Sequence, residues 1–182
     1  DEPDLALYRG YPITAASMRR KLWRDAVGIS GWKILKGLLR GVRNPKARPV
    51  AVRILGVQAA IVAALVALGR PELYLLWFGP YMTQWRVTNR LRALAEHGGM
   101  TRSKDRRETT HIVRQGFWAR VLMVPYGVGY HLAHHVDMSV PWRNLPALHR
   151  ELVASGWVTP ELEYPTYRSL WRKLASKPAE SA

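Results

Sequence analysis

The feature that most constrains the fold is an apolar run between Ile54 and Gly69, ILGVQAAIVAALVALG, in which Gln58 is the only polar side chain. Residues 50–53 extend the run to about twenty positions, which is the length that a helix needs to cross a bilayer. Few helices of soluble proteins are apolar on every face. We therefore predict a membrane-spanning helix over residues 50–69 rather than the buried core helix of a soluble protein.

A second apolar segment follows after a short break. The letters GRPE at 69–72 interrupt the run, and LYLLWFGPYMTQW at 73–85 is apolar again. Its tryptophans and tyrosines suit the boundary between hydrocarbon and lipid headgroups. Together the two segments predict an all-α fold built on an integral-membrane helical hairpin, with transmembrane spans at residues 50–69 and 73–88.

Basic residues lie on both sides of this hairpin. Residues 1–49 contain eleven Lys or Arg and residues 86–182 contain fifteen, with only Arg53 and Arg70 between them. A hairpin leaves both flanks on one side of the membrane, and the positive-inside rule assigns that side to the cytoplasm. We predict an integral-membrane segment with both ends cytoplasmic.

The composition narrows the classes of partner. The chain has no cysteine, which excludes disulfide scaffolds, thiolate zinc sites and cysteine nucleophiles. Its formal net charge of +15 is typical of proteins that bind nucleic acid or an anionic membrane surface. No nucleic-acid-binding motif is present, and the topology and lipid headgroups account for the charge. The sequence therefore predicts a membrane partner and no nucleic acid.

The segments that flank the hairpin also have helical patterns. Residues 14–43 form an amphipathic pattern, either for a helix at the membrane surface or for one packed on the soluble part. After the second span no helix breaker occurs before Gly98, so a helix from Leu73 would place His97 about 36 Å along its axis, beyond a ~30 Å hydrocarbon core. GFWARVLMVPYGVGY at 116–130 is too short to span, and we expect it to return toward the membrane.

Three of the six histidines stand in HLAHH, as His131, His134 and His135. At positions i, i+3 and i+4 of a helix they would point to one side, and neutral imidazoles bind Zn, Cu, Ni and Fe. The zinc-hydrolase motif H-E-x-x-H is excluded because no glutamate is present here. A metal site is the favoured hypothesis, with structural or pH-sensing histidines as the alternative.

These residues carry a resemblance to a known family. GYHLAHHVDMSVPWRNLPALH resembles the third histidine box and following turn of the membrane fatty acid desaturases, and RALAEHG at 92–98 resembles the R-x-x-x-E-H segment after their last span. The opening DEPDLALYRGYP resembles the sequence after their second box, in bacterial members. The resemblance covers Asp4 to Gly156. The sequence differs from many relatives at two places. YGVGYH, at the start of the histidine motif, lacks the asparagines that they have there, and Val136-Asp137-Met138 stands where they have L-F-P.

The resemblance implies a function and a ligand set. The function is O2-dependent, di-iron insertion of a double bond into a lipid acyl chain, with O2 as co-substrate. An electron donor such as ferredoxin or cytochrome b5 would be needed. The two iron ions would take His97, His131, His134 and His135 as ligands, with no catalytic side chain beyond them. Glu96, Asp137 and Asn144 are candidate partners of these ligands, whereas we expect His111 to be solvated or locally hydrogen-bonded and His149 to be structural.

The resemblance also implies how the segment is organised. Residues 1–182 would be the C-terminal part of a desaturase domain, with cytoplasmic or interfacial helices in residues 1–49. Residues 89–182 would form a cytoplasmic region that carries the third box. Because the first two boxes are absent from this sequence, we expect the segment alone to be inactive. The alternatives are a related membrane di-iron lipid hydroxylase or ketolase, and a non-catalytic basic membrane hairpin protein.

Overall fold

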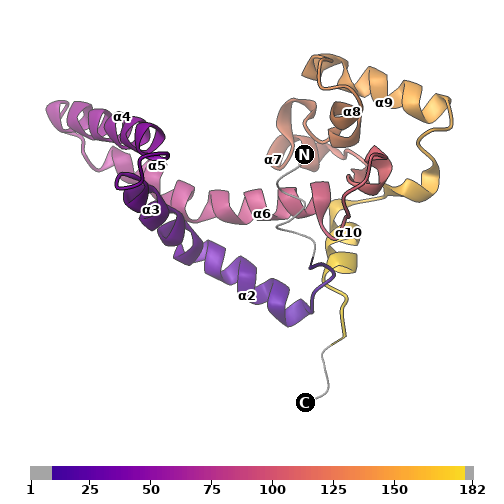
Figure 1. The fold of residues 1–182 in the computed structure, drawn as a ribbon, viewed down its shortest axis with the longest axis horizontal. Helices are drawn as coiled ribbons and strands as arrows, with labels where there is room; N and C mark the ends of the chain where they lie inside the picture. The colour runs from indigo at the N-terminus through magenta and orange to yellow at the C-terminus, as the bar shows by residue number, and fades with distance from the viewer. Residues whose placement is uncertain (1–9, 179–182) are drawn as a thin grey trace. The chain divides into compact units, whose positions relative to one another are not determined.

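The computed structural model describes residues 10–178 (Figure 1). The described chain is mostly helical, which confirms the all-α class, and its only strands are a pair of two residues each. The described residues divide into two compact units: unit 2 comprises residues 20–88, and unit 1 comprises residues 10–19 and 89–178. Most of the opening DEPDLALYRGYP, residues 1–9, lies outside the described residues.

Unit 2 is built around α4 (Arg48–Ala67), the helix predicted from the apolar run. At ~1.5 Å per residue its 20 residues span about 30 Å, the thickness of a hydrocarbon core. Within residues 10–178 it is the one helix that is long and apolar enough to cross a membrane, and 6% of its most apolar window is buried. Each end of the helix lies two residues earlier in the chain than the corresponding end of the predicted span at 50–69. Gly69, just after the helix, has a left-handed φ of 68°.

The expectation of one unbroken helix from Leu73 to His97 is wrong, because the structure divides this segment into two helices. Helix α5 (Leu73–Met82) has 10 residues, and Thr83 has the non-helical angles φ −123° and ψ −83° before α6 (Gln84–His97) begins. Pro80 lies inside α5 and lacks an N–H, so it weakens the helix one turn before the break. Since α5 covers only about 15 Å, a transmembrane span over residues 73–88 stays a prediction.

The helices of unit 2 pack against one another, and two of their contacts are especially close. The Tyr74 hydroxyl of α5 donates a hydrogen bond of 3.0 Å to Oε1 of Gln58, the single polar residue of the apolar run. Helix α3 (Ile29–Gly41) approaches α5 so closely at Gly31 that a Cβ there would overlap the Met82 carbonyl group. Unit 2 also includes most of α2 (Ala15–Ala26).

Unit 2 buries very little apolar surface within itself. Among residues 20–88, all of which the structure describes, Ala51 is the only buried apolar side chain. Large side chains such as Trp77 and Leu76 are mostly exposed. An exposed apolar surface of this extent in a folded protein marks contact with a membrane or another protein.

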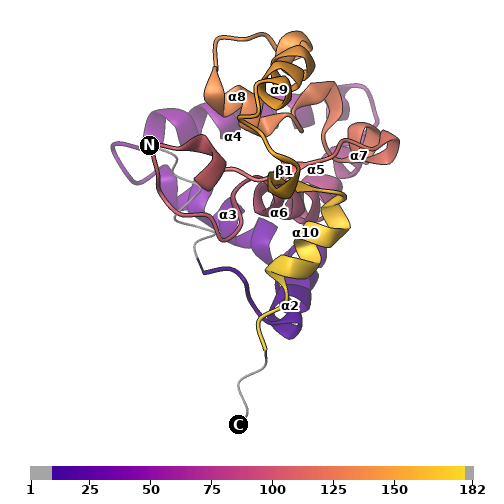
Figure 2. The same ribbon diagram turned by 90° about the vertical axis from the view of Figure 1, so that its right-hand side faces the viewer.

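Unit 1 has a conventional small core. Its parallel strand pair, β1 (Ile112–Val113) and β2 (Glu163–Tyr164), pairs Ile112 with Glu163 and lies between α8–α9 and α10 (Figure 2). The α-helices of this part are α7 (Phe117–Leu122), α8 (His131–Val136), α9 (Leu145–Ala154) and α10 (Tyr167–Leu174). The 3-10 turns are η1 (Arg106–Glu108), η2 (Pro125–Gly127), η3 (Trp142–Asn144) and η4 (Pro160–Leu162). Leu94 of α6, Leu132 of α8 and Leu170 of α10 are buried, and Leu132 packs in one cluster with Ile112 of β1 and Val158.

Candidate metal centre

The histidines of the site come from two helices of unit 1. His97 is the last residue of α6 and is buried. The helix ends there because Gly99 turns the chain with a left-handed φ of 73°. His131 and His135 are one helical turn apart on α8, and the apolar side of that helix, Leu132 and Ala133, is buried. Packing of that apolar side turns the two imidazoles toward the end of α6.

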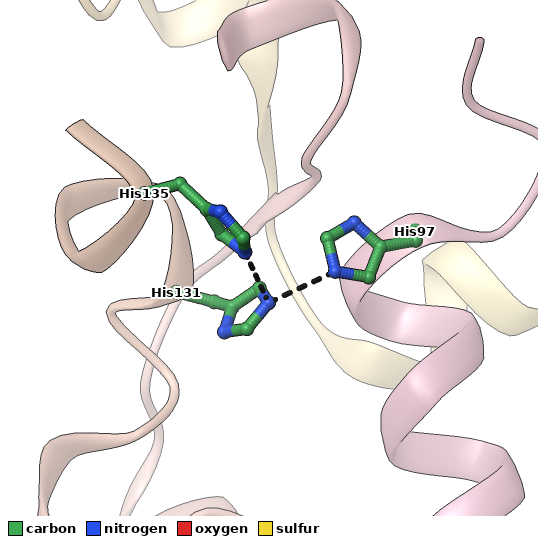
Figure 3. Close-up of side chains that lie close together, drawn as sticks. All are labelled: His97, His131 and His135. Atoms are coloured by element: carbon green, nitrogen blue, oxygen red, sulfur yellow. Dashed lines mark hydrogen bonds between the residues drawn. The ribbon is translucent and has the colours of Figure 1, made fainter. Parts of the chain in front are cut away.

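The three imidazoles converge on a common point (Figure 3). His131 Nε2 lies 3.1 Å from His97 Nε2 and 3.0 Å from His135 Nε2. One nitrogen from each of the three rings falls within 4.8 Å of the others. Histidines 34 positions apart in the chain thus present three ring nitrogens to one small volume.

The hydrogen bonds around the rings decide which nitrogen carries a proton. His97 Nδ1 lies 2.8 Å from the Thr109 carbonyl oxygen. A carbonyl only accepts, so Nδ1 is the donor, and a neutral His97 therefore presents the lone pair of Nε2 to the other two rings. His131 Nδ1 lies 3.8 Å from Oε1 of Glu96, and a proton on this Nδ1 would likewise leave Nε2 with a lone pair.

Burial keeps His131 neutral. Desolvation, followed by the charges of His135 and His97, lowers the pKa of His131 from 6.5 to about 2. The neutral imidazole is the form that binds a metal ion. His131 is therefore in its ligating form across the physiological pH range.

The donor set fits a metal ion. His131 Nε2 is close to both His97 Nε2 and His135 Nε2. A neutral imidazole nitrogen carries either one proton or one lone pair, so His131 Nε2 cannot satisfy both neighbours with hydrogen bonds. A cation placed among the three nitrogens would satisfy all three lone pairs at once, and imidazole suits Fe, Zn, Cu and Ni.

His134 lies beside this group. Its ring centre is 5.7 Å from that of His135 and 6.2 Å from that of His131, but it is not among the three residues that share the site. At about 100° of rotation per residue, His131 and His135 are ~40° apart around the helix while His134 is ~100° from His135. A role for His134 as a ligand therefore stays a prediction.

Of the three expected partners of the ligands, only Glu96 is near them. Its Oε1 accepts a 2.6 Å hydrogen bond from Nε of Arg92, one turn earlier on α6, and it faces His131 Nδ1. Asp137 is exposed, and its carboxylate accepts hydrogen bonds from the Ser139 backbone N–H and hydroxyl. Asn144 is exposed at the start of α9. Among the described residues neither contacts the histidine cluster, so the expectation for these two is wrong.

The remaining two histidines have partners outside the cluster. His111 is half-buried and its Nε2 lies 2.6 Å from the carbonyl oxygen of Gly98, 13 positions earlier, so it is hydrogen-bonded to a distant residue and not to a sequence neighbour as expected. Burial lowers the pKa of His111. His149 Nε2 lies 3.3 Å from Oε1 of Glu163 on β2, in agreement with a structural role.

Two contributors to the site were not found from the sequence. The Thr109 carbonyl that orients His97 gives no signal, because every residue has a carbonyl group. Gln115 donates from Nε2 to the carbonyls of Val113 and Gly129, at 2.7 and 3.1 Å, and lies 3.2 Å from the Tyr167 hydroxyl. It thereby fixes the backbone two residues before His131. The Arg92–Glu96 pair did have a signal, the i, i+4 spacing of opposite charges on a helix.

Comparison with known proteins identifies the family. The family model described as "Fatty acid desaturase" matches residues 1–171 of the 182. Searches of curated proteins and of solved structures gave no match. The family match covers the apolar helix, the Arg92–Glu96–His97 segment and the histidines of α8. The chain belongs to the fatty acid desaturase family.

Proposed function

We propose that the chain forms part of the iron site of a membrane fatty acid desaturase that inserts a double bond into a lipid acyl chain. The observation that carries this proposal is the convergence of His97, His131 and His135 Nε2 atoms in a chain of the desaturase family. The proposed reaction uses O2 as co-substrate and takes two electrons from a donor such as ferredoxin or cytochrome b5.

His97, His131 and His135 would hold an iron ion, with His134 as a further ligand. When bound, non-haem iron supplies the oxidising power needed to remove hydrogen from an unactivated methylene. The protein's own contribution is to orient the ligands and to keep water away from them. The Thr109 carbonyl holds the His97 tautomer, while Glu96, itself held by Arg92, faces the outer nitrogen of His131.

The proposed reaction needs two iron ions, and these four histidines are too few to hold both. We propose that the remaining ligands come from residues outside this sequence. We also propose that α4 anchors the protein in the bilayer and that both flanks of the hairpin lie in the cytoplasm. The support for this orientation is the distribution of Lys and Arg, eleven in residues 1–49 and fifteen in residues 86–182.

Lipid profiling and iron analysis test the proposal together. The protein that carries this chain is expressed in cells, and the acyl chains of the extracted lipids are compared with those of cells that express its His131→Ala and His135→Ala variants. We expect new double bonds and bound iron with the original protein, and neither with the variants. His149→Ala is the matched control, because His149 pairs with Glu163 outside the cluster and its loss should leave iron in place.

Other outcomes would point to the other functions. Hydroxylated or ketolated chains without new double bonds would replace the desaturase proposal by a related hydroxylase or ketolase. Absence of iron from both the original protein and the variants would favour a non-catalytic membrane hairpin protein.

A further inference from the structure

Unit 1 exposes a group of large apolar side chains that its own core leaves uncovered. They lie on α7, η2 and η3, and we call them the aromatic surface: Phe117, Trp118, Val121, Leu122, Tyr126 and Trp142. Phe117 and Trp118 are 71% and 70% exposed, and Tyr126 is 73% exposed. In a unit that buries Leu94, Leu132 and Leu170 completely or nearly so, this exposure is unlike the surface of an ordinary soluble domain.

The aromatic surface contains two pairs of adjacent rings on neighbouring elements. Phe117 and Trp118 have ring centres 5.2 Å apart on α7, and Tyr126 of η2 stacks edge-on against Trp142 of η3 at 5.6 Å. Helix α7 packs against η2, and η2 packs against η3. Tyr126 adopts a left-handed φ of 59°, a conformation that residues with a side chain seldom adopt. The exposed apolar side chains of the aromatic surface therefore lie on three adjoining elements.

Basic side chains accompany the aromatic surface. Between residues 115 and 144 the chain has two arginines, at 120 and 143, and a single acidic residue, Asp137. Arg114, just before this stretch, is paired with Glu163 at 3.0 Å. The Arg143 guanidinium lies 5.3 Å from the centre of the Trp142 ring. Arginine beside tryptophan, tyrosine and leucine is the pattern of segments that lie in the interfacial region of a membrane with anionic lipids.

We propose that the aromatic surface inserts into the headgroup region of an anionic membrane, as a contact of unit 1 that is separate from the apolar helix α4. The charge complementarity favours a lipid surface, because its phosphates match the arginines and its acyl boundary accepts the aromatic rings. The contact itself needs no iron chemistry. In one respect it rests on the proposed function: α8 begins four residues after η2, so insertion would hold His131 close to the membrane that contains the acyl substrate.

Site-directed spin labelling tests this proposal. The chain has no cysteine, so a cysteine introduced into it is a unique labelling position. Phe117→Cys and Leu122→Cys place a nitroxide on the aromatic surface. Val153→Cys is the matched control, since Val153 is an exposed apolar residue of α9 on the same unit. Each labelled chain is reconstituted into nanodiscs of phosphatidylcholine mixed with phosphatidylglycerol.

The measurement is the accessibility of the label to O2, which concentrates in lipid, relative to a water-soluble nickel chelate. We expect a several-fold higher O2-to-nickel ratio at positions 117 and 122 than at position 153. Ratios at 117 and 122 equal to that of the control would overturn the proposal. Low accessibility to both reagents would overturn it as well, because it would show burial against a protein instead of lipid.

The lipid charge provides a second test that does not depend on enzyme activity. In nanodiscs of phosphatidylcholine alone, or with the double substitution Arg120→Gln and Arg143→Gln, we expect the ratio at position 117 to fall toward the control. An unchanged ratio under both conditions would refute the role of anionic headgroups. Because the labels report contact with lipid, a protein that bound no iron and desaturated nothing would still give a positive result.

Discussion

Gln115 and Gly129 provide a sharp test of how the backbone before His131 is held. A Cβ on Gly129 would overlap the Gln115 side-chain amide, which donates to the carbonyls of Val113 and Gly129 and contacts the Tyr167 hydroxyl. Gly129 is not one of the glycines with a positive φ. An alanine at position 129 can therefore adopt the same backbone conformation. The cost of Gly129→Ala therefore comes from displacing the amide.

The magnitude follows from the hydrogen bonds that the displaced amide would lose. Its two N–H groups form two good hydrogen bonds at about 1 kcal/mol each, so Gly129→Ala should lower the free energy of unfolding by about 2 kcal/mol. Gln115→Ala should cost about the same. In the double variant the alanine at 129 meets no amide, so its added cost should fall below about 0.5 kcal/mol, a strong coupling in a double-mutant cycle.

Thermal unfolding of the four proteins in one detergent, followed by circular dichroism, measures the cycle. A loss of about 2 kcal/mol corresponds to roughly 4–8 °C in Tm for a chain of this size. Each single variant should melt lower by that amount, and the double variant should melt close to Gln115→Ala. Additive Tm losses in the double variant would refute the explanation, because they would show that the two positions act independently.

Three further substitutions, Glu96→Gln, Leu170→Ala and His111→Gln, test the site and the core of unit 1. Glu96→Gln should weaken iron binding by about tenfold or more, because it removes the carboxylate that faces His131 Nδ1; competition with a chelator measures the change, and unaltered affinity would contradict it. Leu170→Ala should lower the free energy of unfolding by about 2–5 kcal/mol, since that side chain is 0% exposed. A loss below about 1 kcal/mol in denaturant unfolding would show that neighbouring side chains fill the cavity. Because burial lowers the pKa of His111 below 6.5, the unfolded chain binds a proton more readily than the folded one, so stability should fall as pH drops below about 6.5. Unfolding measured from pH 7.5 to 5 should show a shallower decline for His111→Gln, and equal slopes would exclude this contribution.

Some elements were predictable because their signals are local. The helix at Arg48–Ala67 follows from apolar side chains on every face, which is a property of neighbouring residues and needs no knowledge of what packs against them. The break at Thr83 was missed although Pro80 stands in the segment. Proline ends or kinks some helices and is tolerated in others, and the outcome here depends on how α5 packs on α3 at Gly31.

The candidate site was predictable in its residue types and less so in its arrangement. His97, His131 and His135 were all named from their motifs, and the structure brings them together. The expected partners Asp137 and Asn144 were wrong, because position next to a motif along the chain does not determine contact in space. Asp137 instead completes a local turn with Ser139, which is a common use of aspartate.

By itself the sequence determined an apolar helix long enough to cross a membrane, two basic flanks and three imidazoles at 131, 134 and 135 on one helix. These depend on hydrophobicity, charge and helical periodicity, which act over a few residues. Only the tertiary structure decided that His97 joins two of the three imidazoles, that the Thr109 carbonyl sets its tautomer and that His134 lies outside the group. These depend on contacts between residues far apart in the chain, and such contacts are set by how α6 and α8 pack within unit 1, where Leu94 and Leu132 are buried.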